Sequence, residues 1–467
     1  MAGVLIRNAD VRGHGLADVR IAGDVIVAIG RLEGRSGEVV VDAGGGALMP
    51  GLHDHHIHLA GLAARRSSVW CGPPQVTNRE QLARALQAPG DGWIRGIGYH
   101  ESVCGSLLAA RELDVLVADR PLRMQHRSGR MWLLNSAALE ALLSRADPPP
   151  GLERDASGHT GRLFDEDAWL RGALGSVPPD FAAISRDLAS HGITGVTDMS
   201  VGNDPAMAAH FAGQIASGAL VQNLLLAGGL GLAGAAPGPW RLGPAKLHLH
   251  EAALPPFDDA VAFVRAGHEQ GRSLAIHCVT EVELVYALAA LETAGTRRGD
   301  RIEHASVASP ELVERIAGLG LWVCVQPHFV AERGDQYLAD VEPRQRADLY
   351  RLRMLEQAGI PMAGGSDAPF GGANPWASMA AAVSRRTPCG QSIGGGEALE
   401  EESALGLYLA APGDFTSQRS IAVGETADLC LLTRPWTDVR NDLACAEVAI
   451  TIISGRIVHQ RVDQSPA

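Results

Sequence analysis

The sequence predicts an α/β protein: a parallel (β/α)8 barrel, or TIM barrel, with a small β-sandwich domain formed by both termini. Two observations favour this fold. Short apolar strands alternate with helical segments through the middle of the chain, as in a parallel barrel. Short strands broken by Gly and Asp occupy residues 1–50 and 424–462. We therefore expect residues 1–50 and 405–467 to form one composite sandwich and residues 51–404 to form the barrel.

Length and composition narrow the class of protein. The chain has 467 residues, of which 46% are hydrophobic, so it can bury a large core. The net charge is −13 and no basic cluster stands out, so we expect no nucleic-acid partner. Seven cysteines without a CxxC pair indicate reduced thiols. With no signal-peptide pattern and no apolar run of about 18 residues, we expect a cytoplasmic protein without a membrane span. We leave open whether it forms homo-oligomers.

The expected elements follow in order after the sandwich strands of the N-terminus. "ALMPGLHDHHIHL" is the first barrel strand, and an insertion at about 62–119 comes after it. The later expected strands are 121–126, 192–200, 245–252, 273–278, 301–306, 321–329 and 360–370. Residues 145–165, rich in Pro, Gly and Asp, indicate a loop or lid. A helix is expected from Ser309, which suits the N-cap, and Pro310, which suits the first helical position.

The segment "HDHHIH" holds four histidines in six positions. Side chains alternate faces along a strand, so His56 and His58 share one face with Asp54, while His53 and His55 share the other. A His-x-His pair on one face brings two imidazoles toward one point, which suits a divalent metal. The pattern is weak by itself, because the chain has 17 histidines and repeats it at His248 and His250.

Three later residues strengthen the metal hypothesis. His277 ends the apolar run "SLAIHC", His304 ends "RIEH", and Asp367 follows "IPMAGGS". Each lies where a strand gives way to a loop. In a parallel barrel this edge is the C-terminal face, where active sites lie. The shared position predicts that these side chains meet.

Lys246 is the single lysine among 40 basic residues. It lies in "PAKLHLHEA", on the expected strand before His277. Burial in a barrel would lower its pKa, and a neutral lysine amine can add CO2 to form an anionic carbamate that bridges two cations. Arginine cannot do this because it keeps its proton. We therefore predict a carboxylated lysine; the alternative is a leftover surface lysine.

Six residues stand in the order in which a known superfamily arranges its metal ligands on barrel strands. They are His56, His58, Lys246, His277, His304 and Asp367. This set resembles the amidohydrolase superfamily, and "MPGLHDHHIHL" is similar to its "PGxxDxHxH" motif. "GWIRGIGYHE", "HRSGRMWLLNSAAL" and "GETADLCLL" are similar to amidohydrolase family 3, the branch of the N-substituted formamide deformylases and YtcJ-like proteins.

The resemblance implies a metal-dependent hydrolase that cleaves an amide, formamide, carbamate or related C–N bond of a small molecule by metal-activated hydroxide. Two divalent ions per chain are implied, with zinc favoured over cobalt or manganese. His56, His58 and Asp367 would hold one ion and His277 and His304 the other, with carboxylated Lys246 as the bridge. Asp367 would act as the catalytic base and then as the acid.

Two departures from the family pattern concern histidines. Where the branch has "Lys-Ile/Val-x-x-Asp", His248 and His250 follow Lys246 here, and either could line the pocket or replace a ligand. His55 stands where the family has Ser or Thr, and we expect it to face away from the metal. The remaining pocket candidates, chosen by loop position, are Tyr99, His100, Arg127, Gln326 and His328.

Three alternatives stay open at the level of the sequence. A mononuclear ring deaminase of the same superfamily would carry His-x-x-Glu after the fifth strand, but Thr280 stands at that place and Glu281 one residue further on. A thiocarbamate or ester hydrolase would use the same ligands. A binding protein on a decayed barrel would be expected to have lost ligands, and all six remain.

Overall fold

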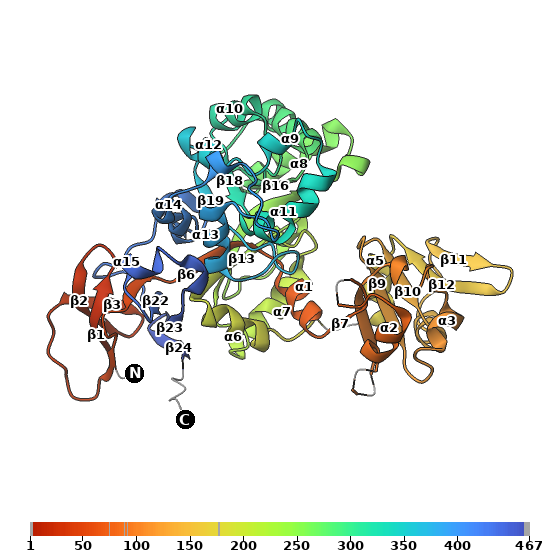
Figure 1. Cartoon of the computed structure of the whole chain (residues 1–467), viewed down its shortest axis with the longest axis horizontal. Coiled ribbons are helices and arrows are strands. Elements are labelled where there is room, and N and C mark those ends of the chain that lie inside the picture. Colours follow the sequence, from red (N-terminus) through yellow and green to blue (C-terminus); the bar gives the residue numbers. More distant parts are fainter. Residues whose placement is uncertain (1–2, 74, 88, 91, 176–177, 462–467) are drawn as a thin grey trace. The chain divides into compact units, whose positions relative to one another are not determined.

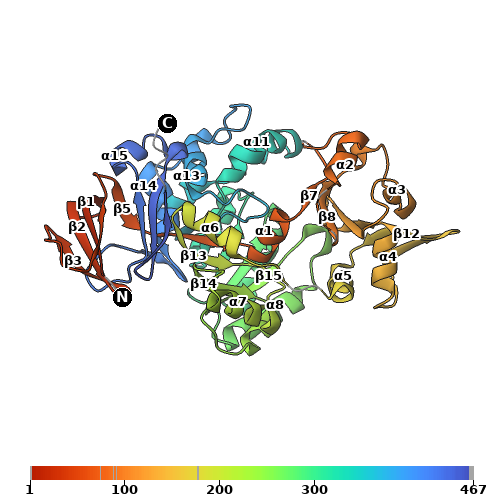
Figure 2. The same ribbon diagram turned by 90° about the horizontal axis from the view of Figure 1, so that it is seen from below.

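The computed structural model describes residues 3–73, 75–87, 89–90, 92–175 and 178–461. The chain forms two compact units. The first unit comprises Met1–Leu59 and Asp180–Ala467, and the second is Ala60–Pro179. Figures 1 and 2 show the elements of both units in two views. Among the residues described, no helix is long and apolar enough to cross a membrane.

Both ends of the chain contribute to one β domain within the first unit. Its strand order is β24-β23-β22-β5-β1-β2-β3, with β4 paired to β1, so the hydrogen bonding is continuous. The N-terminal strands are β1 (Val4–Val11), β2 (Gly15–Ala22), β3 (Val25–Gly30), β4 (Val39–Asp42) and β5 (Ala47–Pro50). The C-terminal strands are β22 (Leu429–Leu432), β23 (Val448–Ile453) and β24 (Arg456–Gln460). The predicted β domain built from both termini is confirmed, and red and blue strands lie side by side in Figure 1.

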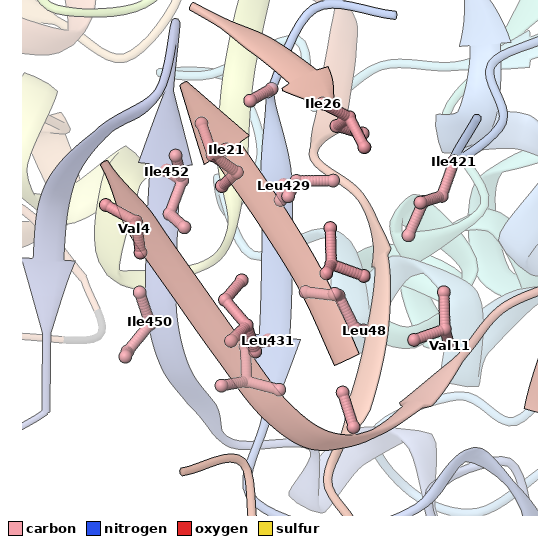
Figure 3. Packing of buried hydrophobic residues seen from close by; sticks show 14 residues of the cluster. Val4, Val11, Ile21, Ile26, Leu48, Ile421, Leu429, Leu431, Ile450 and Ile452 are labelled. Atoms are coloured by element: carbon pink, nitrogen blue, oxygen red, sulfur yellow. The ribbon is translucent and has the colours of Figure 1, made fainter. Parts of the chain in front are cut away.

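Buried aliphatic side chains join the two ends of the chain in this domain. Ile21 and Ile26 pack in one cluster with Leu429 and Ile452, although some 400 residues separate them in the sequence (Figure 3). Fully burying such a side chain contributes about 1.5–3 kcal/mol. The cluster therefore fixes the N-terminal strands against the C-terminal ones.

Eight parallel strands form the barrel of the first unit. They are β6 (Leu52–Ile57), β13 (Ile193–Asp198), β14 (Asn223–Gly228), β15 (Arg241–His248), β16 (Leu274–Cys278), β17 (Arg301–His304), β18 (Trp322–Val325) and β19 (Met362–Gly364). They pair in this order, from β6 to β19. At the closing seam, the Asp367 amide donates to the His56 carbonyl at 2.6 Å and the His58 amide to the Ala368 carbonyl at 2.8 Å. The predicted TIM barrel is confirmed.

Helices precede or follow the barrel strands. They are α6 (Ala182–Ser190), α7 (Pro205–Ala216), α8 (Phe257–Glu269), α9 (Glu281–Ala294), α10 (Pro310–Gly318), α11 (His328–Asp340), α12 (Leu352–Gln357), α13 (Pro375–Ser384) and α14 (Glu401–Leu409). In α10, Ser309 occupies the N-cap and Pro310 the first turn, as predicted. In α9, Thr280 and Glu283 form a capping box. The capping box satisfies amides that the first turn of α9 leaves without partners, whereas the Ser309 side chain makes no capping hydrogen bond.

The second unit has its own six-stranded sheet, ordered β11-β12-β10-β9-β8-β7. Its strands are β7 (Val69–Trp70), β8 (Ile94–Tyr99), β9 (Leu122–His126), β10 (Met131–Leu134), β11 (Leu152–Asp155) and β12 (Gly158–Phe164). Its helices are α1 (Leu59–Arg66), which begins at the unit boundary, α2 (Arg79–Ala85), α3 (Ala110–Asp114), α4 (Ser136–Leu143) and α5 (Asp167–Leu174). The unit therefore extends beyond the insertion at about 62–119 that the sequence predicts.

Two expectations for the second unit are wrong. The sequence pattern places residues 121–126 among the barrel strands, but β9 lies between β8 and β10 in the separate sheet. Residues 145–165 are not a loop throughout, because β11 and β12 pair as an antiparallel hairpin around Asp155 and Gly158. Gly158 has a φ of +119°, which side-chain-bearing residues rarely adopt. The glycine that suggested a loop thus serves the turn of a hairpin.

Candidate metal centre

The six predicted ligands lie near the C-terminal ends of barrel strands. His56 and His58 lie at the end of β6, Lys246 near the end of β15, and His277 near the end of β16. His304 is the last residue of β17, and Asp367 follows β19. In parallel barrels the loops at this edge carry the active site.

Four imidazole rings form a continuous group at this edge. The ring centroids of His56 and His58 are 5.2 Å apart, those of His56 and His304 4.9 Å, and those of His277 and His304 4.6 Å. These rings come from β6 and the residue that follows it, and from β16 and β17. The barrel therefore brings together side chains that lie up to 248 positions apart in the sequence.

Asp367 faces two of these rings. One carboxylate oxygen lies 3.1 Å from Nε2 of His58 and 3.3 Å from Nε2 of His56. One potential ligand atom from each of the three residues lies within 4.8 Å of the others. Burial alone would raise the pKa of Asp367, but hydrogen bonds from His56 and His58 and the charge of His56 outweigh it and hold the pKa well below its usual range. The carboxylate is thus ionised near neutral pH.

The Nδ1 atoms of three rings are occupied by protein partners. Nδ1 of His56 lies 2.5 Å from Glu303, Nδ1 of His58 lies 3.0 Å from Ser200 Oγ, and Nδ1 of His304 lies 2.8 Å from Gln326 Oε1. A metal-binding histidine commonly holds a protein partner through the nitrogen that does not bind metal. Nε2 of His304 is buried and has no hydrogen-bond partner among the described residues. The Nε2 atom is therefore without a partner in His304 and faces Asp367 in His56 and His58, an arrangement that fits a divalent cation.

Lys246 is buried beside this group. Its side chain is among the largest that are almost fully buried, and the residue is 2% exposed. Nζ has no hydrogen-bond partner in the part of the chain that the structure describes. Burial lowers the pKa of Lys246, and the charges of Glu303 and Asp367 offset this only in part. A buried amine without a partner fits a group that carries a further substituent or faces a ligand.

Two of the six residues have an unusual backbone. The φ angles of His304 and Asp367 are +75° and +50°, and Ala305 has +46°. Side-chain-bearing residues rarely adopt the left-handed region, and such strain gathers at functional sites. His304 also departs from the strand geometry at the point where its ring turns toward His56 and His277.

The sequence reasoning missed the residues that hold the rings. Glu303 is fully buried and bonds Arg301 as well as His56. Ser200 is held by its amide, which donates to Asp198. The sequence did contain a signal for the contact between Arg301 and Glu303. These two charged residues stand two positions apart in one strand and so share a face. Charged residues on a buried face require partners.

The other histidines of the first strand lie outside the ring group. His53 bonds Thr197 at 2.9 Å, and the ring of His55 packs edge-on against Phe415 at 5.0 Å. The pairing between β6 and β13 slips around His55 and His56, so simple alternation does not assign faces there. The carboxylate of Asp54 accepts from the amides of His56 and Ser366, and burial raises its pKa to about 6.

His248 and His250 differ in position. The ring of His248 lies 4.3 Å from that of His277, at the margin of the group. Burial lowers the pKa of His248 to about 4, with a further contribution from the Lys246 charge. Both residues are exposed, and His250 precedes a short 3-10 helix at Glu251–Ala253. Of the two, only His248 has a ring contact with a predicted ligand.

The remaining pocket candidates have other surroundings. Gln326 bonds His304, and His328 is buried with bonds to Ser378 and to the Ser366 carbonyl. Tyr99 is a core residue of the second unit, where its hydroxyl donates to the Ser106 carbonyl at 2.7 Å. His100 bonds Ser102 within the second unit, and Arg127 is exposed there. Three of the five, Tyr99, Gln326 and His328, are thus buried residues with internal partners.

Comparison with known proteins agrees with this geometry. Residues 39–459 match the model of the amidohydrolase family. The chain is 27% identical to YtcJ of Bacillus subtilis (strain 168), which bears an amidohydrolase name, over 90% of each chain. It is 26% identical to the N-substituted formamide deformylase of Arthrobacter pascens, over 98% of this chain and 97% of that one.

A solved structure supports the fold. An uncharacterized metal-dependent hydrolase from Pyrococcus horikoshii OT3 superposes with a TM-score of 0.77, at 20% identity, over 98% of this chain and 100% of the other. The match to the family model covers nearly the whole chain, including all six predicted ligands. The protein therefore belongs to the amidohydrolase family and is a hydrolytic enzyme that acts on C–N bonds other than peptide bonds.

Proposed function

We propose that the enzyme hydrolyses a small-molecule amide, formamide or carbamate with two divalent cations, most suitably zinc, and a carboxylated Lys246. The observation that carries the proposal is the buried amine of Lys246, which has no hydrogen-bond partner among the described residues although it lies within a group of histidines and Asp367. A relative of similar length bears the name N-substituted formamide deformylase, which supports the formamide class.

The proposed ligands divide into two sets. His56, His58 and Asp367 would hold one ion, and His277 and His304 the other. Cysteine-free sets of imidazole and carboxylate suit zinc, and also cobalt or manganese. When bound, the cations supply Lewis-acid polarisation of the substrate carbonyl and lower the pKa of a water molecule.

Lys246 would complete the site by a covalent step. A neutral amine adds through its nitrogen lone pair to the carbon of CO2, a C–N bond forms, and one proton is released to water. The product is an anionic carbamate with two oxygen donors. Burial favours this step because it lowers the pKa of Lys246 and so increases the fraction of neutral amine.

Asp367 would move the proton. As a carboxylate beside the candidate ion site, it can accept a proton from the attacking water and return it to the nitrogen of the leaving group. His58, whose Nδ1 faces Ser200 Oγ at 3.0 Å, would hold the same ion as Asp367. Cleavage then yields a carboxylic or carbamic acid and an amine.

The structure offers no support for the deaminase alternative. That alternative needs a carboxylate at position 280 to transfer protons, and Thr280 instead caps helix α9 by accepting from the Glu283 amide. Glu281 accepts from the side chain of Gln345 at 2.8 Å. Both residues therefore have structural partners.

The test is hydrolysis of a small panel by metal-replete protein, with metal content measured on the same sample. The panel contains N-formyl amines, N-acyl amino acids, cyclic ureas, carbamates, thiocarbamates and an aminated ring. We expect amine release from a formyl, acyl or carbamoyl nitrogen and about two ions per chain. Ammonia release from the ring with one ion per chain would support the deaminase instead. Cleavage of thiocarbamates alone would contradict the proposed substrate class and support a thiocarbamate hydrolase.

The carbamate has a separate test. Metal-free protein is reconstituted with zinc in the presence and absence of 13C-bicarbonate, and the carbon-13 spectrum is recorded. Because Lys246 is the only lysine, one side-chain carbamate signal is expected, and activity should return only with bicarbonate. Full activity without bicarbonate and without a carbamate signal would contradict the proposed bridge.

A further inference from the structure

Glu303 and Arg301 form an ion pair in the interior of the barrel. Oε1 of Glu303 lies 2.6 Å from Nε of Arg301, and the two side chains are 0% and 3% exposed. Glu303 pairs with His277 of the neighbouring strand β16, and partners in parallel strands share a face. The pair thus lies on the face that carries His277, within the group of candidate ligands.

The second oxygen of Glu303 faces a candidate ligand across the barrel. Oε2 lies 2.5 Å from Nδ1 of His56. Across the closing seam of the barrel, β18 and β19 lie between β6 and β17, the strand that carries Glu303. Arg301 also contacts β6, because its Nη2 donates to the carbonyl of His55 at 3.2 Å. Two neighbouring residues of β6 are therefore held by the same ion pair from β17.

Glu303 groups with His56 and Cys324 as ligand-type residues, but both of its carboxylate oxygens have protein partners, His56 and Arg301. It contacts Nδ1 of His56, whereas Asp367 faces Nε2, the other nitrogen of the ring. A carboxylate at Nδ1 accepts the ring N–H, so the lone pair must be on Nε2. The ring orientation and its tautomer are both set by this contact.

The partners of the other rings are neutral. Nδ1 of His58 faces the hydroxyl of Ser200, and Nδ1 of His304 faces the amide of Gln326. Only His56, among these three rings, has a carboxylate at Nδ1. A carboxylate raises the basicity of the imidazole more than a neutral acceptor does, and the loss of such a partner typically weakens metal binding 10–100-fold.

We infer that Glu303, held by Arg301, is a positioning residue that fixes His56 with Nε2 toward Asp367 and makes the ion site of His56, His58 and Asp367 the tighter of the two. The inference rests on the proposed two-metal function. The ion pair thus has a role beyond folding, because it determines the metal affinity of the site of His56. Gln326, which contacts His304, acts in the same way on the other site.

The experiment is metal titration of the metal-free enzyme with Zn2+ by calorimetry and with Co2+ by visible absorption. Glu303→Gln keeps the side-chain volume but removes the charge that polarises His56. We expect one of the two ions to bind about 10–100-fold more weakly than in the parent, with a changed Co2+ spectrum. Gln326→Met, which removes the partner of His304, should weaken the other ion and leave the first unchanged.

The chain offers a matched control. Arg20 and Glu38 form another Arg–Glu pair with the same 2.6 Å contact between Nε and Oε1, and their side chains are 5% and 9% exposed. That pair lies in the β domain, so Glu38→Gln should leave both metal affinities and the Co2+ spectrum unchanged. Equal losses in Glu303→Gln and Glu38→Gln would overturn the inference, because they would reflect a general effect on folding.

Other outcomes separate this inference from the proposed function. If the parent binds two ions and hydrolyses the panel, but Glu303→Gln binds both ions with parental affinity, the inference fails and the function stands. A parent that binds no metal refutes both. If Glu303→Gln does not fold, the double variant Arg301→Met/Glu303→Gln also removes the guanidinium that would be left buried without its carboxylate. This double variant should show the same weaker binding of one ion. Parental affinity for both ions in the double variant would overturn the inference.

Discussion

Replacing Lys246 by methionine should stabilise the metal-free protein and abolish its activity. In the metal-free state Nζ is buried without a hydrogen-bond partner among the described residues. A buried polar group in this state costs about 1–3 kcal/mol. Methionine is unbranched and similar in length, and it brings no hydrogen-bonding group into the site. We therefore expect metal-free Lys246→Met to exceed the metal-free parent in stability by about 1–3 kcal/mol.

The corresponding shift in melting temperature is small but measurable. The unfolding entropy is about 2.1 cal/mol/K per residue, so for a chain of this length 1 kcal/mol corresponds to about 1 °C. Lys246→Met should thus raise the Tm of the metal-free protein by about 1–3 °C in a thermal scan by circular dichroism. Metal-replete Lys246→Met should be inactive, since methionine cannot form a carbamate.

Lys246→Arg provides the contrast at the same position. Arginine preserves the positive charge but cannot lose its proton, and it would place a second guanidinium near Arg301, whose charge already acts on Lys246. We expect this variant to be inactive and its metal-free Tm to fall below that of the parent. Activity of Lys246→Met at full metal loading, or a lower metal-free Tm in that variant than in the parent, would refute the reasoning.

Three further predictions concern the same site. Asp367→Asn should reduce turnover at least ~100-fold at full metal loading, since it removes the proton acceptor; turnover near the parental rate would assign that task to another residue. His58→Ala should lose metal and activity, whereas His55→Ala, which removes a ring packed on Phe415, should lose stability but keep its metal; metal analysis beside thermal scans decides this, and full metal in His58→Ala would contradict the ligand assignment. Gly365→Ala should lower both Tm and metal content, because an added Cβ would lie 2.5 Å from Cβ of His56 and 2.6 Å from its amide nitrogen, and such overpacking costs about 1–3 kcal/mol or more; a variant with parental Tm and metal content would show that the strand can shift.

The sequence determined the fold class and the residues with metal-binding chemistry. Alternating strands and helices predict a barrel because each parallel strand needs a crossover, and the crossovers are visible as helical segments. The ends of strands can be recognised in a sequence, so the amino-acid order is sufficient to locate His277 and His304 at strand ends. The single lysine is conspicuous by composition alone.

The boundaries of the second unit depended on pairing between distant strands. β9 is as short as a barrel strand, although its sequence LRMQH alternates apolar and polar residues, whereas β18 reads WVCV. That β9 belongs to the sheet of the second unit follows from its hydrogen bonds to β8 and β10, which form only in the folded structure. The hairpin of β11 and β12 was missed because Gly and Asp are common to loops and to tight turns.

Only the tertiary structure decided which partners hold the candidate ligands. Glu303 lies beside His304 in the sequence, yet its carboxylate contacts His56, 247 positions away. Strand periodicity places Glu303 on a face but does not reveal what lies opposite, because that depends on how eight strands close around one interior. The same closure leaves Lys246 without a hydrogen-bond partner among the described residues. Residue types and strand ends thus come from local chemistry, whereas the contacts across the barrel come from its closure.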